Sequence, residues 1–154
     1  MVDVADMALD FTLPATGDTS VTLSALQPKA IVLFFYPRDN TAGCTKEAIG
    51  FTENLAAFDA AGAHVFGISK DNMASHERFL AKKELGMPLL SDADSEVCEA
   101  YGVWKEKKMY GKTFMGIERS TFLIDGTGRI ANVWRKVKVD GHVQDVLDAV
   151  KALG

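Results

Sequence analysis

Residues 30–36, AIVLFFY, are apolar at every position, and this run constrains the fold more than any other part of the chain. It is far shorter than the roughly 20 apolar residues that cross a bilayer. It also lacks the alternation of a strand that has one face in water. An unbroken apolar run of this length is typical of a strand covered on both faces. The sequence therefore predicts a central strand inside an α/β sandwich.

Strands and helices are expected to alternate along the rest of the chain. Two β-hairpins are indicated, one over 11–24 with a Thr-Gly-Asp turn and one over 120–135 around Asp125–Gly128. Further buried strands are predicted over 64–69 and 88–92, and helices over 44–62, 73–85, 95–103 and 142–153. This order is that of a thioredoxin-like α/β fold, with a central mixed β-sheet flanked by helices and an N-terminal β-hairpin. No repeat or linker interrupts it, so residues 1–154 are expected to form a single domain.

Charge and cysteine content argue against several function classes. The net charge is −4, and the only dense basic run, KEKKMYGK at 105–112, is interpreted as a solvated loop, with partner binding as the alternative. No nucleic-acid-binding stripe is indicated. The N-terminus lacks the basic region of a secretory signal and no segment could cross a membrane, so we expect a cytoplasmic protein without a membrane partner. The two cysteines and three scattered histidines match no disulfide framework or zinc pattern, and no metal site is expected.

Cys44 follows the central strand at the expected start of a helix, within YPRDNTAGCTKEA (36–48). The free N–H groups and the dipole of a first helical turn favour the thiolate, which is the nucleophilic form of cysteine. Thr41 is expected to cap this helix by accepting a hydrogen bond from the Cys44 N–H. Gly43 allows the backbone to approach whatever lies at the sulfur, and Pro37 sets the path of the chain out of the strand. The alternative is a small buried hydrophobe. No C-x-x-C motif is present, which argues against a dithiol exchanger.

The segment YPRDNTAGCTKEA resembles the peroxiredoxin active-site loop, P-x-x-x-T-x-x-C. The block at 101–130, YGVWKEKKMYGKTFMGIERSTFLIDGTGRI, followed by WRKVKVDGH, resembles the peroxiredoxin Q branch, also called bacterioferritin comigratory protein. The resemblance implies a thiol peroxidase that reduces hydrogen peroxide and organic hydroperoxides and needs no metal, haem or flavin. It also implies that Cys44 is the peroxidatic nucleophile. Thr41, Gly43 and Arg119 would bind the peroxide, and Pro37 would shield the thiolate pocket.

Glu47 and Glu118 flank the two key charges, at places where the family pattern has acids. Glu47 lies one turn after Cys44 and is a candidate to orient Arg119 through a charge-assisted hydrogen bond. A solvated helix face is the alternative for Glu47. His76 and His142 are interpreted as structural.

The chain departs from the family pattern at three places. Ala42 stands where the family usually has proline, which reduces loop rigidity and removes no reacting atom. Ile49 and Leu80 occupy the two usual positions of a resolving cysteine. Cys98 is the remaining candidate, and a packing role beside Tyr101 is favoured over a resolving one.

The sequence therefore predicts a one-cysteine peroxidase, a monomer or weak dimer, recycled by an external thiol such as thioredoxin, glutaredoxin or glutathione. Two alternatives stay open. One is a two-cysteine enzyme resolved by Cys98. The other is a thioredoxin-fold binding module without peroxidase activity, against which the intact Pro37, Thr41, Cys44 and Arg119 argue.

Overall fold

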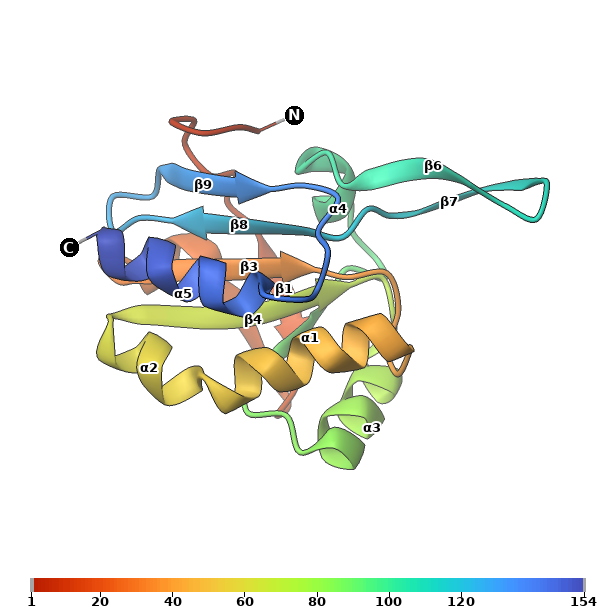
Figure 1. Cartoon of the computed structure of the whole chain (residues 1–154), viewed down its shortest axis with the longest axis horizontal. Helices are drawn as coiled ribbons and strands as arrows, with labels where there is room; N and C mark the ends of the chain where they lie inside the picture. The colour runs from red at the N-terminus through yellow and green to blue at the C-terminus, as the bar shows by residue number, and fades with distance from the viewer. Residues whose placement is uncertain (1, 154) are drawn as a thin grey trace.

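A computed structural model describes residues 2–153 of the chain. Its centre is a seven-stranded sheet with the strand order β2-β1-β5-β4-β3-β8-β9 (Figure 1). The strands are β1 Thr12–Ala15, β2 Thr19–Thr22, β3 Ala30–Phe35, β4 Ala63–Ser69, β5 Leu89–Ser91, β6 Trp104–Met109, β7 Lys112–Ile117, β8 Ser120–Ile124 and β9 Ile130–Trp134. The helices are α1 Ala42–Glu53, α2 Leu55–Ala60, α3 Met73–Lys83, α4 Val97–Ala100 and α5 His142–Ala152, with a 3₁₀ turn η1 at Leu23–Leu26. None of these helices is long and apolar enough to cross a membrane.

Strand β3 lies inside the sheet, as the apolar run predicts. It pairs in parallel with β4 and antiparallel with β8, and β4 pairs in parallel with β5. The strands β1, β8 and β9 are antiparallel to their neighbours, so the sheet is mixed. The five residues Ile31–Phe35 are buried, because successive side chains enter different core layers on the two faces. Both predicted hairpins form, as β1–β2 and β8–β9.

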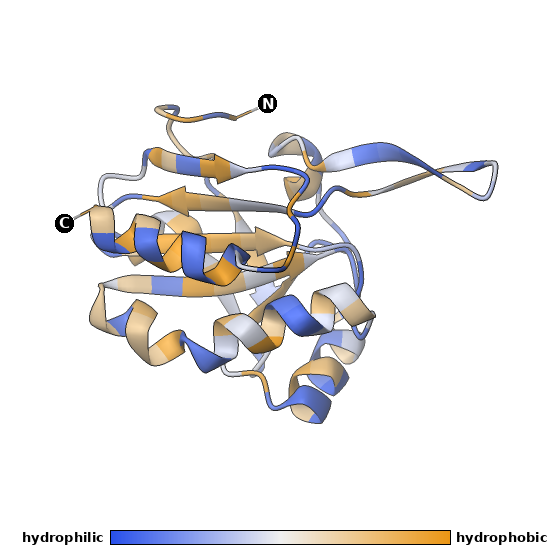
Figure 2. Ribbon diagram, in the orientation of Figure 1, coloured by the Kyte–Doolittle hydropathy of each residue, from blue (hydrophilic) through white to orange (hydrophobic). Residues whose placement is uncertain are grey.

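The two core layers lie on opposite faces of this sheet. Leu33 and Phe35 belong to the layer that is closed by η1, α4 and the N-terminal segment. Val32 and Phe34 belong to the layer that is closed by α1, α2, α3 and α5. The apolar colouring of the central strands in Figure 2 follows this arrangement, and the helices turn their polar residues outward. The predicted α/β sandwich is therefore confirmed.

Two helices differ from the sequence prediction. The helix expected over 44–62 begins two residues earlier and is split into α1 and α2 at Asn54. The Asn54 side-chain amide donates to the carbonyl of Gly50, and its backbone leaves helical geometry. The helix expected over 95–103 is only the short α4, which ends before Gly102 with its φ of 73°.

The run at 105–112 is part of a hairpin, so its interpretation as a loop was wrong, although most of its residues are exposed to solvent as expected. Strands β6 and β7 pair from Trp104↔Ile117 to Met109↔Lys112. The turn between them holds Tyr110 and Gly111 at φ 52° and 76°, a geometry that suits a tight two-residue hairpin turn. Lysine-rich strands carry a weak β signal, which is why sequence periodicity missed this element. We call the hairpin 104–117 the arm, and Figure 1 shows it projecting from the sheet.

Candidate active site

Cys44 is the third residue of α1, the helix that follows β3 along the chain. Strand β3 delivers the chain to this end of the sheet, and the loop 36–41 turns it into the helix. The side chain is buried at 1% exposure and packs in the helical core layer. The sulfur therefore lies at the N-terminal, positive end of a twelve-residue helix.

Arg119 reaches Cys44 from the link between β7 and β8. Its Nη2 atom donates to the Cys44 sulfur at 3.4 Å, and its Nη1 atom donates to Glu47 Oε1 at 2.7 Å. Burial lowers the pKa of Arg119, but the neighbouring Glu47 and Cys44 raise it by more, so its net shift is upward. The guanidinium is thus a fixed cation between a carboxylate and the sulfur.

Glu47 is fully buried, so the hydrogen bond to Arg119 is confirmed and the solvated helix face was wrong. Burial raises the pKa of Glu47 to about 7, against the lowering effect of Arg119. The Oε2 atom finds no hydrogen-bond partner among the described residues. The nearest imidazole is that of His142, whose Nε2 lies 3.9 Å away and is hydrogen-bonded to Thr121 Oγ1 at 2.8 Å. Nothing in the sequence links His142 to Glu47, because α5 brings it there from the other end of the chain.

Thr41 occupies the N-cap position of α1, but the expected capping bond is absent. Its hydroxyl donates to the carbonyl of Arg38 at 2.9 Å and does not accept from the Cys44 N–H. The Thr41 side chain, at the end of the loop 36–41, is exposed to solvent. With its hydrogen engaged by Arg38, the Thr41 oxygen keeps its lone pairs free to accept a hydrogen bond from a ligand.

Gly43 and Pro37 lie on either side of this loop. A Cβ atom built on Gly43 would lie 3.0 Å from Arg119 Nη2, so the missing side chain admits the guanidinium. Sequence reasoning placed a close approach at Gly43, and the structure identifies Arg119 as the approaching group. Pro37 is half-buried directly after β3.

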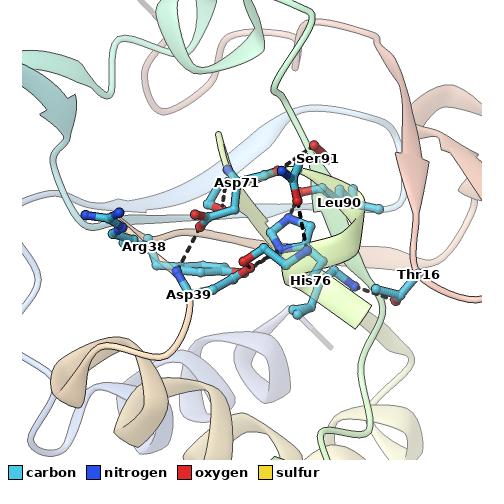
Figure 3. A network of polar contacts seen from close by, with 12 residues as sticks. Thr16, Arg38, Asp39, Asp71, His76, Leu90 and Ser91 are labelled. Atoms are coloured by element: carbon cyan, nitrogen blue, oxygen red, sulfur yellow. Dashed lines mark hydrogen bonds and ion pairs between the residues drawn. The ribbon is translucent and has the colours of Figure 1, made fainter. Parts of the chain in front are cut away.

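A buried polar network holds the loop before Cys44 (Figure 3). Asp39 accepts hydrogen bonds from the Tyr36 hydroxyl at 2.6 Å, from the Ser75 hydroxyl at 2.8 Å and from His76 Nδ1 at 2.7 Å. Burial alone would raise the pKa of Asp39, but His76 and Tyr36 hold it below its usual value. The Asp39 backbone N–H donates to Asp71 at 2.8 Å. The loop is therefore fastened to α3 and to the end of β4.

His76 confirms its interpretation as a structural residue. Its Nδ1 faces the Asp39 carboxylate, and its Nε2 lies 2.8 Å from the carbonyl of Leu90. Both partners are protein oxygens, so the ring is held from both sides. Asp39, Asp71 and His76 bring potential metal-ligand atoms within 4.8 Å of one another. Because both His76 nitrogens already contact protein oxygens, we interpret this cluster as a hydrogen-bond network.

Cys98 lies on the other side of the sheet from Cys44. It is fully buried in the layer that contains Tyr101, whereas Cys44 belongs to the helical layer. Burial is the main cause that raises the pKa of the Cys98 thiol, and the nearby Asp92 raises it further. The Asp92 carboxylate accepts from the Cys98 backbone N–H at 2.7 Å. Packing is thus the observed role of Cys98 in this conformation.

The assembled site offers a sulfur nucleophile, a fixed cation with several N–H donors and, at the N-cap three residues before the sulfur, a hydroxyl oxygen with free lone pairs. This set suits attack on a small polar molecule that develops negative charge. Sequence reasoning identified Cys44, Thr41, Arg119 and Glu47. It missed Asp39 as the loop fastener and the approach of His142, for which local sequence offers no signal.

Comparison with known proteins agrees with this chemistry. The chain matches the model of the AhpC/TSA family over residues 4–133. It is 45% identical to peroxiredoxin Bcp of Xanthomonas campestris, over 99% of this chain and 95% of that protein. A structure of the X. campestris bacterioferritin comigratory protein, from work on its alkyl peroxide reduction activity, is 47% identical with a TM-score of 0.88, over 93% of this chain and 91% of that one. The structure of a PrxQ mutant from Xylella fastidiosa is 43% identical with a TM-score of 0.94, over 99% of this chain and 98% of that one.

The similarity to each of these three proteins spans nearly the whole of this chain and nearly the whole of the other protein. The neighbouring structures are thioredoxin-fold peroxiredoxins, which confirms the predicted fold class. The chain therefore belongs to the AhpC/TSA family and is a peroxiredoxin, a thiol-dependent peroxidase.

Proposed function

We propose that Cys44 is the peroxidatic cysteine and that hydrogen peroxide and organic hydroperoxides are its substrates. The observation that carries this proposal is the 3.4 Å contact between Arg119 Nη2 and the Cys44 sulfur at the start of α1. The thiolate attacks the terminal oxygen of the peroxide, and the O–O bond breaks as the S–O bond forms. Cysteine sulfur is oxidised to sulfenic acid, and the departing alkoxide or hydroxide takes up a proton to leave as alcohol or water.

Thr41 and Arg119 have complementary tasks in this step. The Thr41 oxygen, whose own hydrogen is donated to Arg38, accepts the hydrogen bond of the peroxide O–H. The Arg119 guanidinium donates to the oxygens between which charge moves, and Glu47 keeps it in place. Gly43 leaves room for this guanidinium, and Pro37 limits access of water to the sulfur.

An external thiol completes the cycle. It attacks the sulfenic sulfur, forms a mixed disulfide with Cys44 and releases water; a second thiol then frees Cys44 and leaves as the disulfide. The burial of Cys98 in the opposite core layer supports this one-cysteine cycle over resolution within the chain. We further propose that the chain acts as one thioredoxin-like domain, since both core layers share a single sheet.

Replacement of Cys44 by serine tests the proposal. The variant retains nearly the same side-chain shape, but its hydroxyl is not ionised at neutral pH, so we expect peroxide consumption to be lost. Mass spectrometry after one equivalent of hydrogen peroxide should find a single added oxygen on wild-type Cys44, trapped by a sulfenic-acid reagent. Cys98→Ser is the matched control and should form the same adduct. Substantial turnover in Cys44→Ser would show that another residue is the nucleophile.

A further inference from the structure

The arm exposes large apolar side chains that nothing in the described chain covers. Met109, Tyr110, Phe114 and Met115 are 58%, 97%, 43% and 50% exposed, and Figure 1 shows the arm extending clear of the sheet and helices. An isolated two-stranded hairpin is marginally stable in water. Apolar side chains gathered on one projecting element indicate a surface that meets another molecule.

The pairing register separates the arm into two faces. Side chains alternate along each strand, and directly paired residues share a face. One face carries Lys105, Lys107, Met109, Lys112 and Phe114, and we call it the lysine face. The other carries Trp104, Glu106, Lys108, Thr113 and Met115.

The base of the arm adjoins the candidate active site, because β7 ends at Ile117, two residues before Arg119. Lys107 is half-buried, and its aliphatic chain and the Phe114 ring both lie over Gly116, where an added Cβ would meet them at 3.3 and 3.4 Å. Burial and the Arg119 charge lower the pKa of Lys107, while Cys44 and Glu118 raise it. The lysine face therefore extends from the base of the arm, near Arg119, to its tip at Met109 and Lys112.

The charge of the arm is opposite to that of the whole chain. Residues 104–117 contain four lysines and a single acidic residue, Glu106, in a protein of net charge −4. A basic and apolar surface of this kind complements a partner with an acidic, partly apolar surface. The surface of the arm is less suited to a second copy of this acidic chain, and the experiment below tests for self-association.

We propose that the lysine face is the docking surface for the protein thiol that reduces oxidised Cys44, and that this partner carries an acidic surface around its reactive thiol. The inference rests on the one-cysteine cycle proposed above. Cys44 is 1% exposed, so a reducing thiol has to stay bound beside the site until it reaches the sulfur. Electrostatic attraction to the lysines speeds encounter, and contact with Phe114 and Met109 prolongs it.

Two matched double variants separate docking from chemistry. Lys112→Glu/Phe114→Ser alters the lysine face, and Lys108→Glu/Met115→Ser makes the same charge reversal and a comparable loss of apolar surface on the opposite face. Neither pair belongs to the residues assigned to the reaction. Each protein is oxidised with one equivalent of hydrogen peroxide and then reduced by a negatively charged thioredoxin, by glutaredoxin or by dithiothreitol, in rapid-mixing experiments at low and high salt.

We expect the lysine-face variant to lose about tenfold or more in its rate with the faster protein reductant, and the opposite-face variant to lose less than about threefold. Both variants should keep wild-type rates of sulfenic acid formation and of reduction by dithiothreitol. The wild-type rate with the protein reductant should fall as salt rises.

Three results would overturn the docking surface. The first is an equal loss, or no loss, in the two variants. The second is a wild type reduced no faster by either protein than by dithiothreitol at equal thiol concentration. The third is a wild type that sediments as a dimer and a lysine-face variant that sediments as a monomer, with unchanged reduction rates. A wild type that forms no sulfenic acid at Cys44 would instead refute the proposed function itself.

Discussion

At the scale of single residues, the site depends on a row of three charged or ionisable groups. The Cys44 sulfur, the Arg119 guanidinium and the Glu47 carboxyl are joined by contacts of 3.4 and 2.7 Å. All three are shielded from water, so their mutual interactions are stronger than on a protein surface. In the proposed reaction, the position of Arg119 therefore controls both the nucleophile and the charge that develops on the peroxide.

Arg119→Ala should lower the rate of peroxide reduction by about two orders of magnitude or more, by analogy with the loss of an oxyanion donor. Arg119→Lys should restore only part of the rate, because an ammonium lacks the planar fork of donors. Gly43→Ala should lower the rate less, since its methyl group displaces a flexible guanidinium from 3.0 Å. Stopped-flow kinetics with hydrogen peroxide measures all three, and an unaltered rate in Arg119→Ala would remove this residue from the site.

Glu47 should leave a signature in the pH dependence of stability. Its pKa is raised from 4.5 to about 7 by burial, so the folded state holds this proton more tightly than the unfolded state. The stabilisation is complete below pH 4.5 and is lost as pH rises to 7, by at most about 3 kcal/mol. Burial lowers the pKa of His142 from 6.5 to about 4, and this has the opposite effect: the folded protein becomes more stable as pH rises from 4 to 6.5.

The two effects oppose each other in the wild type, but Glu47→Gln retains His142. The difference in free energy of unfolding between Glu47→Gln and wild type therefore isolates the effect of Glu47. Urea denaturation should show this difference shifting in favour of the variant between pH 4.5 and 7. Glu53→Gln, at an exposed position of the same helix, is the control and should show no such shift. A difference that stays constant with pH would mean that Glu47 is ionised throughout.

At the scale of elements, the site is a junction between β3, α1 and α3. The loop 36–41 carries the chain from β3 to α1, and the Asp39–His76 pair ties it to α3. The bonds of His76 to Asp39 and to the carbonyl of Leu90 connect three parts of the chain through one imidazole ring. This network fixes the direction in which α1, and with it Cys44, leaves the loop.

His76→Leu should therefore destabilise the protein by about 1–3 kcal/mol, because it leaves the buried Asp39 carboxylate without one of its hydrogen-bond partners. The rate of peroxide reduction should also fall, since the loop before Cys44 loses its tie to α3. Chemical denaturation and single-turnover kinetics measure the two effects. Arg78→Ala, exposed on the same helix, should change stability by no more than about 0.5 kcal/mol. Equal stabilities of the two variants would contradict a structural role of the pair.

At the scale of the whole molecule, the sheet separates the two cysteines. Cys44 lies in the layer of α1, α2, α3 and α5, and Cys98 lies in the layer closed by α4 and η1. A disulfide needs Cα atoms within about 7 Å of each other, so joining these residues would require large local unfolding. The layered architecture thus favours reduction by an outside thiol.

Protein treated with one equivalent of peroxide should accumulate Cys44 sulfenic acid and no bond between Cys44 and Cys98. A non-reducing peptide map detects either product, and the same treatment in urea, where the layers are lost, shows whether the two cysteines can react. Cys98→Ser should keep near-normal turnover with an external thiol. A Cys44–Cys98 peptide from the folded protein, together with lost turnover in Cys98→Ser, would establish the two-cysteine alternative.

The sequence determined the features that arise within short segments. The unbroken apolar run specifies a doubly covered strand, the turn signals specify two hairpins, and the loop motif identifies Cys44 and Thr41. The signal of the arm was weak because its strands are exposed and rich in lysine, with no buried face to impose a period of two.

Only the tertiary structure decided the relations between distant segments. It placed Arg119 against the Cys44 sulfur, buried Glu47 beside His142, turned the Thr41 hydroxyl toward Arg38 and put the two cysteines on opposite faces of the sheet. These outcomes depend on the strand order and on which helices cover each face. Local propensity does not encode them, because burial and hydrogen-bond partners are set by the packing of segments that are far apart in the chain.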